Sequence, residues 1–161
     1  MAGPQEPTRH RIRNIGNPTL SNMEIYARQL VFHGAVVLLI GLLCGAPYGR
    51  AVNRKAPDLV IHSWRVAHLS IPLGATLMFA VAAILSHLRG SASFKWAVAV
   101  LFIVSTYSFC FSLPLAAVVG QRGLSPGGPT SAKLVYAGNV IGAVSSLLAA
   151  VGLVCMAYIS L

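Results

Sequence analysis

Four long apolar runs constrain this chain more than any other feature of its sequence. They lie at about residues 29–48, 66–88, 96–119 and 134–160. Each run is long enough to cross the ~30 Å hydrocarbon core of a bilayer as a helix. A helix satisfies its backbone hydrogen bonds internally, which an open sheet cannot do in lipid. The sequence therefore predicts an all-α, multi-pass integral membrane protein with four transmembrane helices.

The composition and the spacing of the runs support this class. Hydrophobic residues make up 56% of the chain and charged residues 9%, whereas a soluble domain carries ~25% charged residues. The connections between the runs are short, so consecutive spans should alternate in direction and form an antiparallel bundle. We assign residues 21–161 to this membrane domain and expect the polar residues 1–20 to be disordered.

The net charge of +9 raises the question of a polyanionic partner. The basic residues are scattered outside the apolar runs and form no block, so we expect them to contact the lipid bilayer and not nucleic acid. Lysines and arginines divide equally between the two membrane sides, and the positive-inside rule therefore assigns no orientation. We call the side that carries the first and third connections side B, and the other side A.

Acidic residues are scarce, and this limits the chemistry of the chain. Aspartate and glutamate together number 3, and Glu6, Glu24 and Asp58 all lie outside the apolar runs. The sequence contains no GxSxG, Walker or HExxH motif. These absences argue against a carboxylate-driven proton pump and against a hydrolase that uses paired carboxylates.

Small residues recur at four-residue spacing in two of the runs. Gly41 and Gly45 lie in the first run, and the fourth run contains the longer series Gly138, Gly142, Ser146 and Ala150. Such stripes allow helix backbones to approach closely in a membrane. They predict close helix packing, within or between chains, but they identify no function.

Histidines within or at the ends of the apolar runs are the candidates for function, because ionisable groups are costly in lipid. His87 ends the second run, and we expect it to be solvated at the interface. For His33 we expect an interhelical hydrogen bond. His68 differs from both, because Pro72 cannot donate a hydrogen bond to its carbonyl and the helix is weakened at that point.

A neutral imidazole in an apolar slot with arginines at the rim suits a haem, with iron on His68 and propionates on Arg65 and Arg122. All three lie toward side B. A structural histidine is the alternative and is commoner for such residues. Tyr107 and Asn139 could face the same cavity as His68. For Tyr107 and its neighbours Ser105, Thr106 and Ser108 the alternative is a hydrogen bond to a backbone carbonyl of the same or a neighbouring helix.

Three segments occur in an order and spacing that resemble one protein family. They are HGAVVLLIGLLCG from His33, WRVAHLS from Trp64 and QRGLSPG from Gln121. They are similar to the His-Gly opening with Leu-Leu-x-Gly, the Trp-x-x-Ala-His-x segment and the Arg-Gly-Leu-x-x-Gly loop of the styrene oxide isomerases. These are small four-span membrane proteins, and the likeness covers about residues 24–160 as sparse matches.

The resemblance implies a ferric haem b held by His68 and an open iron face that acts as a Lewis acid on an epoxide. The implied reaction is a Meinwald rearrangement to an aldehyde or ketone, without redox change, in trimers with haem between protomers. Two positions depart from the family: its substrate-side asparagine falls on Gly74 and its catalytic tyrosine on Leu113. Either the substrate differs from that of the family, or the polar role passes to Tyr107 or Asn139.

We therefore expect a haem b-dependent membrane isomerase that acts on an apolar epoxide, aryl or terpenoid. One alternative is a non-enzymatic tetraspan scaffold or small transporter, in which the glycine stripes are the main feature. The other is a membrane b-type cytochrome, in which His33 and His87, both near side A, would bind one iron.

Overall fold

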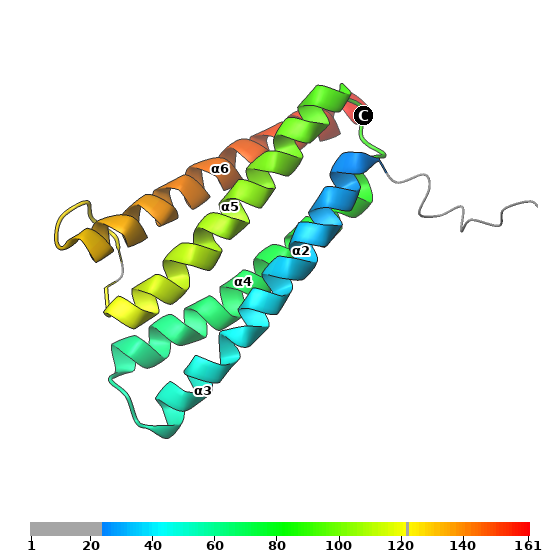
Figure 1. Ribbon diagram of the computed structural model, residues 1–161. Helices are drawn as coiled ribbons and strands as arrows, with labels where there is room; N and C mark the ends of the chain where they lie inside the picture. The colour runs from blue at the N-terminus through cyan, green and yellow to red at the C-terminus, as the bar shows by residue number, and fades with distance from the viewer. Residues whose placement is uncertain (1–23, 122) are drawn as a thin grey trace, which may run out of the picture.

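The computed structural model describes residues 24–121 and 123–161, and the regular structure in these ranges is entirely helical. The helices are α2 (Ile25–Leu43), α3 (Gly45–Asn53), α4 (Asp58–Leu85), α5 (Ala92–Val119) and α6 (Thr130–Ser160), as Figure 1 shows. With α2 and α3 taken together, 4 helices are long and apolar enough to cross a membrane. The predicted all-α, multi-pass membrane class is confirmed. The disorder predicted for residues 1–20 lies outside the described residues.

The helices extend beyond the apolar runs, because apolar residues mark only the part of a helix that needs to be in hydrocarbon. α4 begins at Asp58, directly after Pro57, and a carboxylate in the first turn suits the positive end of the helix dipole. α5 begins after Ser91, whose hydroxyl accepts a hydrogen bond from the backbone N–H of Phe94 at 3.2 Å. It ends at Gly120, which adopts the left-handed conformation common after a helix.

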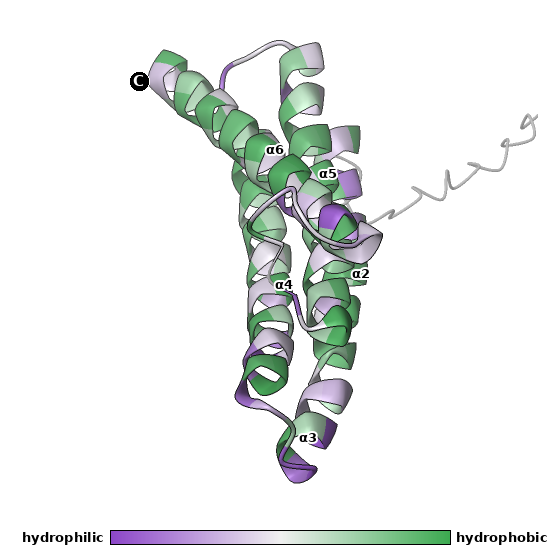
Figure 2. Cartoon of the chain, turned by 90° about the vertical axis from the view of Figure 1, so that its left-hand side faces the viewer, coloured by the Kyte–Doolittle hydropathy of each residue, from purple (hydrophilic) through white to green (hydrophobic). Residues whose placement is uncertain are grey.

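Polar residues lie mainly at the ends of this structure. Figure 2 shows hydrophobic residues along the length of the helices and hydrophilic residues gathered at the turn after α3. The exposed basic residues Arg50, Arg54 and Lys55 lie at this turn. Such a distribution suits helices that cross a bilayer and a basic turn that meets lipid headgroups.

The helices form two closely packed pairs, α2 with α4 and α5 with α6. α5 also contacts α4 and α2, whereas α6 contacts α5 and no other helix in the described part of the chain. Figure 1 shows α6 on the outer side of α5, away from α4 and α2. As a result, α6 leaves one face of α4 uncovered.

Small residues make the tight contacts within both pairs. The backbone of Gly41 in α2 lies against the ring of Pro72 in α4, and the backbone of Gly142 in α6 lies against the ring of Phe109 in α5. An added Cβ at Gly142 would lie 2.8 Å from Cζ of Phe109. The close packing predicted from the stripes therefore occurs within one chain at these positions.

The predicted stripe in α6 does not keep to one face. Gly138 and Gly142 are buried against α5, but Ala150 is exposed, and the buried positions continue at Ser145, Ala149 and Gly152. Every fourth residue of an α-helix is rotated by about 40° from the last, so a four-residue repeat turns away from its partner within a few turns.

Replacing Gly41 by alanine should lower the free energy of unfolding by ~1–3 kcal/mol, because the added methyl group would overlap the ring of Pro72. Gly49→Ala is the matched control, since an added Cβ at Gly49 in α3 meets nothing within 4 Å. Its higher helix propensity should leave stability unchanged or raise it by up to ~1 kcal/mol. Unfolding curves of both variants in one detergent measure the difference, and equal curves would contradict the close α2–α4 contact.

Candidate functional site

His68 lies on the face of α4 that packs against α2 and α3. Its Nδ1 is 3.0 Å from the carbonyl oxygen of Gly41. A carbonyl oxygen can only accept a hydrogen bond, so Nδ1 carries a proton and donates it. In the neutral ring Nε2 then has a lone pair, and it has no hydrogen-bond partner in residues 24–121 or 123–161. An imidazole oriented in this way is suited to bind a metal through Nε2.

The neighbours of His68 in α2 and α3 hold its ring in place. An added Cβ at Gly45 would lie 3.0 Å from Cε1 and 3.2 Å from Nδ1 of His68, so the ring would have to shift by a few tenths of an ångström to accept it. The ring of Tyr48 stacks on the imidazole with a centroid distance of 6.2 Å and an interplanar angle of 24°. The four-residue spacing of Gly41 and Gly45 therefore serves both the helix contact and the histidine.

Of the two arginines predicted to bind propionates, only Arg65 can be placed. It lies one turn before His68 in α4, is exposed, and forms no ion pair with any residue that the structure describes. Its guanidinium is therefore available to an anionic group beside His68. Arg122 lies outside the described residues.

Tyr107 lies on the side of α5 that faces α2. Its hydroxyl is 3.0 Å from Nδ1 of His33, and the two rings meet edge to face with centroids 5.6 Å apart. The interhelical hydrogen bond predicted for His33 is confirmed. The alternative, a hydrogen bond to a backbone carbonyl, is wrong for Tyr107, because His33 supplies a side-chain partner. It is confirmed for Ser105, Thr106 and Ser108, whose hydroxyls donate to the carbonyls of Gly142, Phe102 and Val104.

Asn139 lies in the early turns of α6. Its Nδ2 donates a hydrogen bond to the carbonyl oxygen of Gly123 at 3.4 Å, which ties α6 to the loop that follows α5. Each of His68, Tyr107 and Asn139 has a hydrogen-bond partner in a different part of the chain, and none of the three lines either of the two pockets described in residues 24–121 and 123–161. A cavity that joins them stays a prediction.

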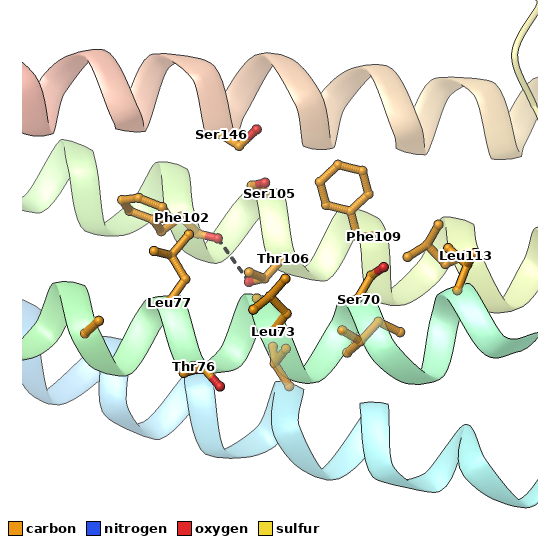
Figure 3. A pocket seen from close by; sticks show the side chains of 15 residues that line it. Ser70, Leu73, Thr76, Leu77, Phe102, Ser105, Thr106, Phe109, Leu113 and Ser146 are labelled. Atoms are coloured by element: carbon orange, nitrogen blue, oxygen red, sulfur yellow. Dashed lines mark hydrogen bonds between the residues drawn. The ribbon is translucent and has the colours of Figure 1, made fainter.

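An apolar pocket of about 750 Å³ lies between α4, α5 and α6 (Figure 3). It is present because α6 does not reach α4. None of the predicted site residues lines this pocket. The sequence did not predict it, because the composition of apolar helices does not show where two helices lie apart. Its lining does include Gly74 and Leu113, the two positions that depart from the family pattern. Most of the wall is apolar, with Leu73, Leu77, Phe102, Phe109 and Leu113 among its residues.

The pocket and His68 lie on opposite faces of α4. Ser70, Leu73 and Leu77 face the pocket and follow the three- to four-residue spacing of one helix face. His68 instead packs against Gly41 and Gly45 of the preceding helices. One chain alone therefore does not bring the candidate metal ligand into this pocket.

Comparison with known proteins identifies one family. A family model described as styrene oxide isomerase matches residues 26–158, which is most of the chain. No curated protein and no solved structure matches the chain.

In histidine-labelled, metal-free protein, ¹⁵N NMR should find the His68 proton on Nδ1, with the signal assigned by its loss in His68→Ala. Gly45→Ala should change this signal, because the added methyl group displaces the ring from the Gly41 carbonyl. Gly49→Ala, where an added Cβ meets nothing within 4 Å, should leave it unchanged. A His68 proton on Nε2 would contradict the proposed geometry.

Proposed function

Because this chain belongs to the styrene oxide isomerase family, we propose that it is a haem b-dependent membrane isomerase that converts an apolar epoxide into an aldehyde or ketone. The observation that supports the proposal is the hydrogen bond from Nδ1 of His68 to the carbonyl of Gly41, which leaves Nε2 of the neutral ring able to bind a metal. The alternatives are a scaffold or transporter and a b-type cytochrome. They differ from the isomerase in haem content, in the number of protein side chains bound to the iron and in epoxide turnover.

The chemistry of these residues fits a haem b. The hydrogen bond from Nδ1 to a carbonyl orients the neutral imidazole, and it would make the ring a more basic ligand for the iron of a haem. Arg65, on the same face of α4 and without an ion pair in the described ranges, suits one propionate through its planar guanidinium. We propose Arg122 as the second propionate partner from its position in the sequence.

A bound ferric haem would supply a Lewis acid for the epoxide oxygen without a change of redox state. The residues of the chain supply the remaining requirements. The apolar walls of the pocket exclude water, which would otherwise add to the positive charge that develops on the substrate carbon. The acids in the described ranges, Glu24 and Asp58, lie at helix starts, far from the middle of the spans. A rearrangement that needs no carboxylate suits this distribution.

Completion of the site requires a second copy of the chain. His68 and the pocket lie on opposite faces of α4, so we propose a homo-oligomer, a trimer by resemblance, in which His68 of one copy serves a pocket of the next. The catalytic roles predicted for Tyr107 and Asn139 stay predictions. Each has a protein partner and neither lines the pocket, so each would act across this interface.

The purified protein should show the intense Soret absorption band of haem b. His68→Ala should lose this band but keep its helical fold, as shown by circular dichroism and a cooperative unfolding curve. His87→Ala is the control, because His87 is exposed and its Nδ1 bonds to Ala83 in its own helix at 3.1 Å. That variant should keep its haem. Full haem retention with an unchanged spectrum in His68→Ala would exclude His68 as the ligand. A wild-type protein without any Soret band would favour the scaffold.

Incubation of the haem-loaded protein with a panel of apolar epoxides should yield aldehydes or ketones without added reductant. Turnover should stop in His68→Ala and on reduction of the iron, because both remove the ferric Lewis acid. Product analysis by gas chromatography measures the conversion. A haem with two protein side chains as axial ligands and no turnover of any epoxide would instead support the cytochrome.

A further inference from the structure

One hydroxyl group in the apolar pocket lacks a protein partner. Five serine and threonine residues line the pocket. Four of them donate hydrogen bonds to backbone carbonyls: Thr76 to Pro72 at 3.0 Å, Ser105 to Gly142 at 2.8 Å, Thr106 to Phe102 at 3.0 Å and Ser146 to Ala143 at 2.9 Å. Ser70 is the fifth, and its hydroxyl bonds to no residue in the described part of the chain.

The position of Ser70 turns its hydroxyl toward the pocket. Ser70 lies about one turn inside the apolar run that begins near residue 66, and its side chain is exposed on the pocket face of α4. Ser63, in the same helix, shows the usual solution, because its hydroxyl donates to the carbonyl of Leu59 at 2.8 Å. Figure 3 instead shows the side chain of Ser70 pointing from α4 toward Phe109 in the pocket. In that orientation the hydroxyl can donate a hydrogen bond to an acceptor on a molecule inside the pocket.

The surroundings of Ser70 define the kind of molecule that fits. The volume of about 750 Å³ is within the ~300–1,000 Å³ range of pockets for drug-sized ligands. Gly74, one turn after Ser70, leaves free space beside the hydroxyl, since an added Cβ would meet only Cγ2 of Thr106, at 3.4 Å. The pocket therefore combines a roomy apolar wall with one available donor.

We propose that Ser70 is the substrate-binding residue that fixes the orientation of an apolar ligand by donating a hydrogen bond to its single acceptor oxygen. The inference rests on the proposed function, in which both the epoxide and the carbonyl product carry such an oxygen. With the other four hydroxyls already bonded to carbonyls, Ser70 alone distinguishes an oxygenated ligand from a hydrocarbon of the same shape.

A matched ligand pair tests this directly. Benzyl phenyl ketone and 1,2-diphenylethane differ by one carbonyl oxygen, and neither is an epoxide. Equilibrium dialysis of each radiolabelled compound against the holoprotein in nanodiscs, corrected with empty nanodiscs, gives the two affinities. Ser70→Ala should weaken ketone binding about two- to ten-fold, the usual worth of one hydrogen bond, and leave hydrocarbon binding unchanged.

Two further variants separate the hydroxyl from the shape of the site. Ser70→Thr keeps the donor and should keep the preference for the ketone. Ser146→Ala removes a pocket hydroxyl that already bonds to Ala143, so the ratio of the two affinities should stay at the wild-type value. The proposal would be overturned if Ser70→Ala left the ratio of ketone to hydrocarbon affinity unchanged, for example by weakening both ligands equally. It would also be overturned if the wild-type protein bound neither ligand.

The proposed function can fail separately. If Ser70→Ala loses the ketone preference but the wild-type protein turns over no epoxide, the binding role of Ser70 stands and the isomerase does not. In the opposite case, the wild-type protein isomerises trans-stilbene oxide, and Ser70→Ala does so with an unchanged KM and an unchanged ratio of ketone to hydrocarbon affinity. The isomerase then stands and the role of Ser70 is overturned.

Discussion

The contact between the backbone of Gly41 and the ring of Pro72 sets the distance between α2 and α4, and the histidine site depends on that distance. The same Gly41 supplies the carbonyl that holds Nδ1 of His68, one turn before Pro72 in α4. A larger residue at 41 would push α4 away and lengthen this hydrogen bond. Helix packing and the protonation of one ring nitrogen are thus coupled through a single glycine.

The second helix pair is held in a similar way but serves a different purpose. Gly142 packs on the ring of Phe109, and Ser105 donates its hydrogen bond to the carbonyl of Gly142 at 2.8 Å, so α5 and α6 are fixed to each other. The pair meets α4 only through α5, and the uncovered face of α4 becomes a wall of the pocket. The pocket is therefore the space left between two rigid pairs, and not a cavity in one closed core.

Sequence patterns indicated the four spans and the interhelical bond of His33, because these depend on local composition and on the cost of polar groups in lipid. They did not indicate that Tyr107 would be the partner of His33, or that Ser70 would face a pocket. Helices in a membrane are apolar on every side, so hydrophobic periodicity does not show which helix faces which. The exposed Ala150, at the end of a regular small-residue repeat, illustrates the same limit.

The pocket also determines how a substrate can arrive. Leu73 and Leu77 line it and are 70% and 50% exposed in a single chain, so the part of its mouth that a neighbouring copy leaves uncovered faces the hydrocarbon of the bilayer. Molecules then enter by lateral diffusion after dissolving in the membrane, and their concentration at the pocket is set by their partition coefficient. Occupancy of the pocket follows the mole fraction of substrate in lipid. When the total amount of substrate is fixed, more membrane dilutes it in the lipid, and the occupancy falls.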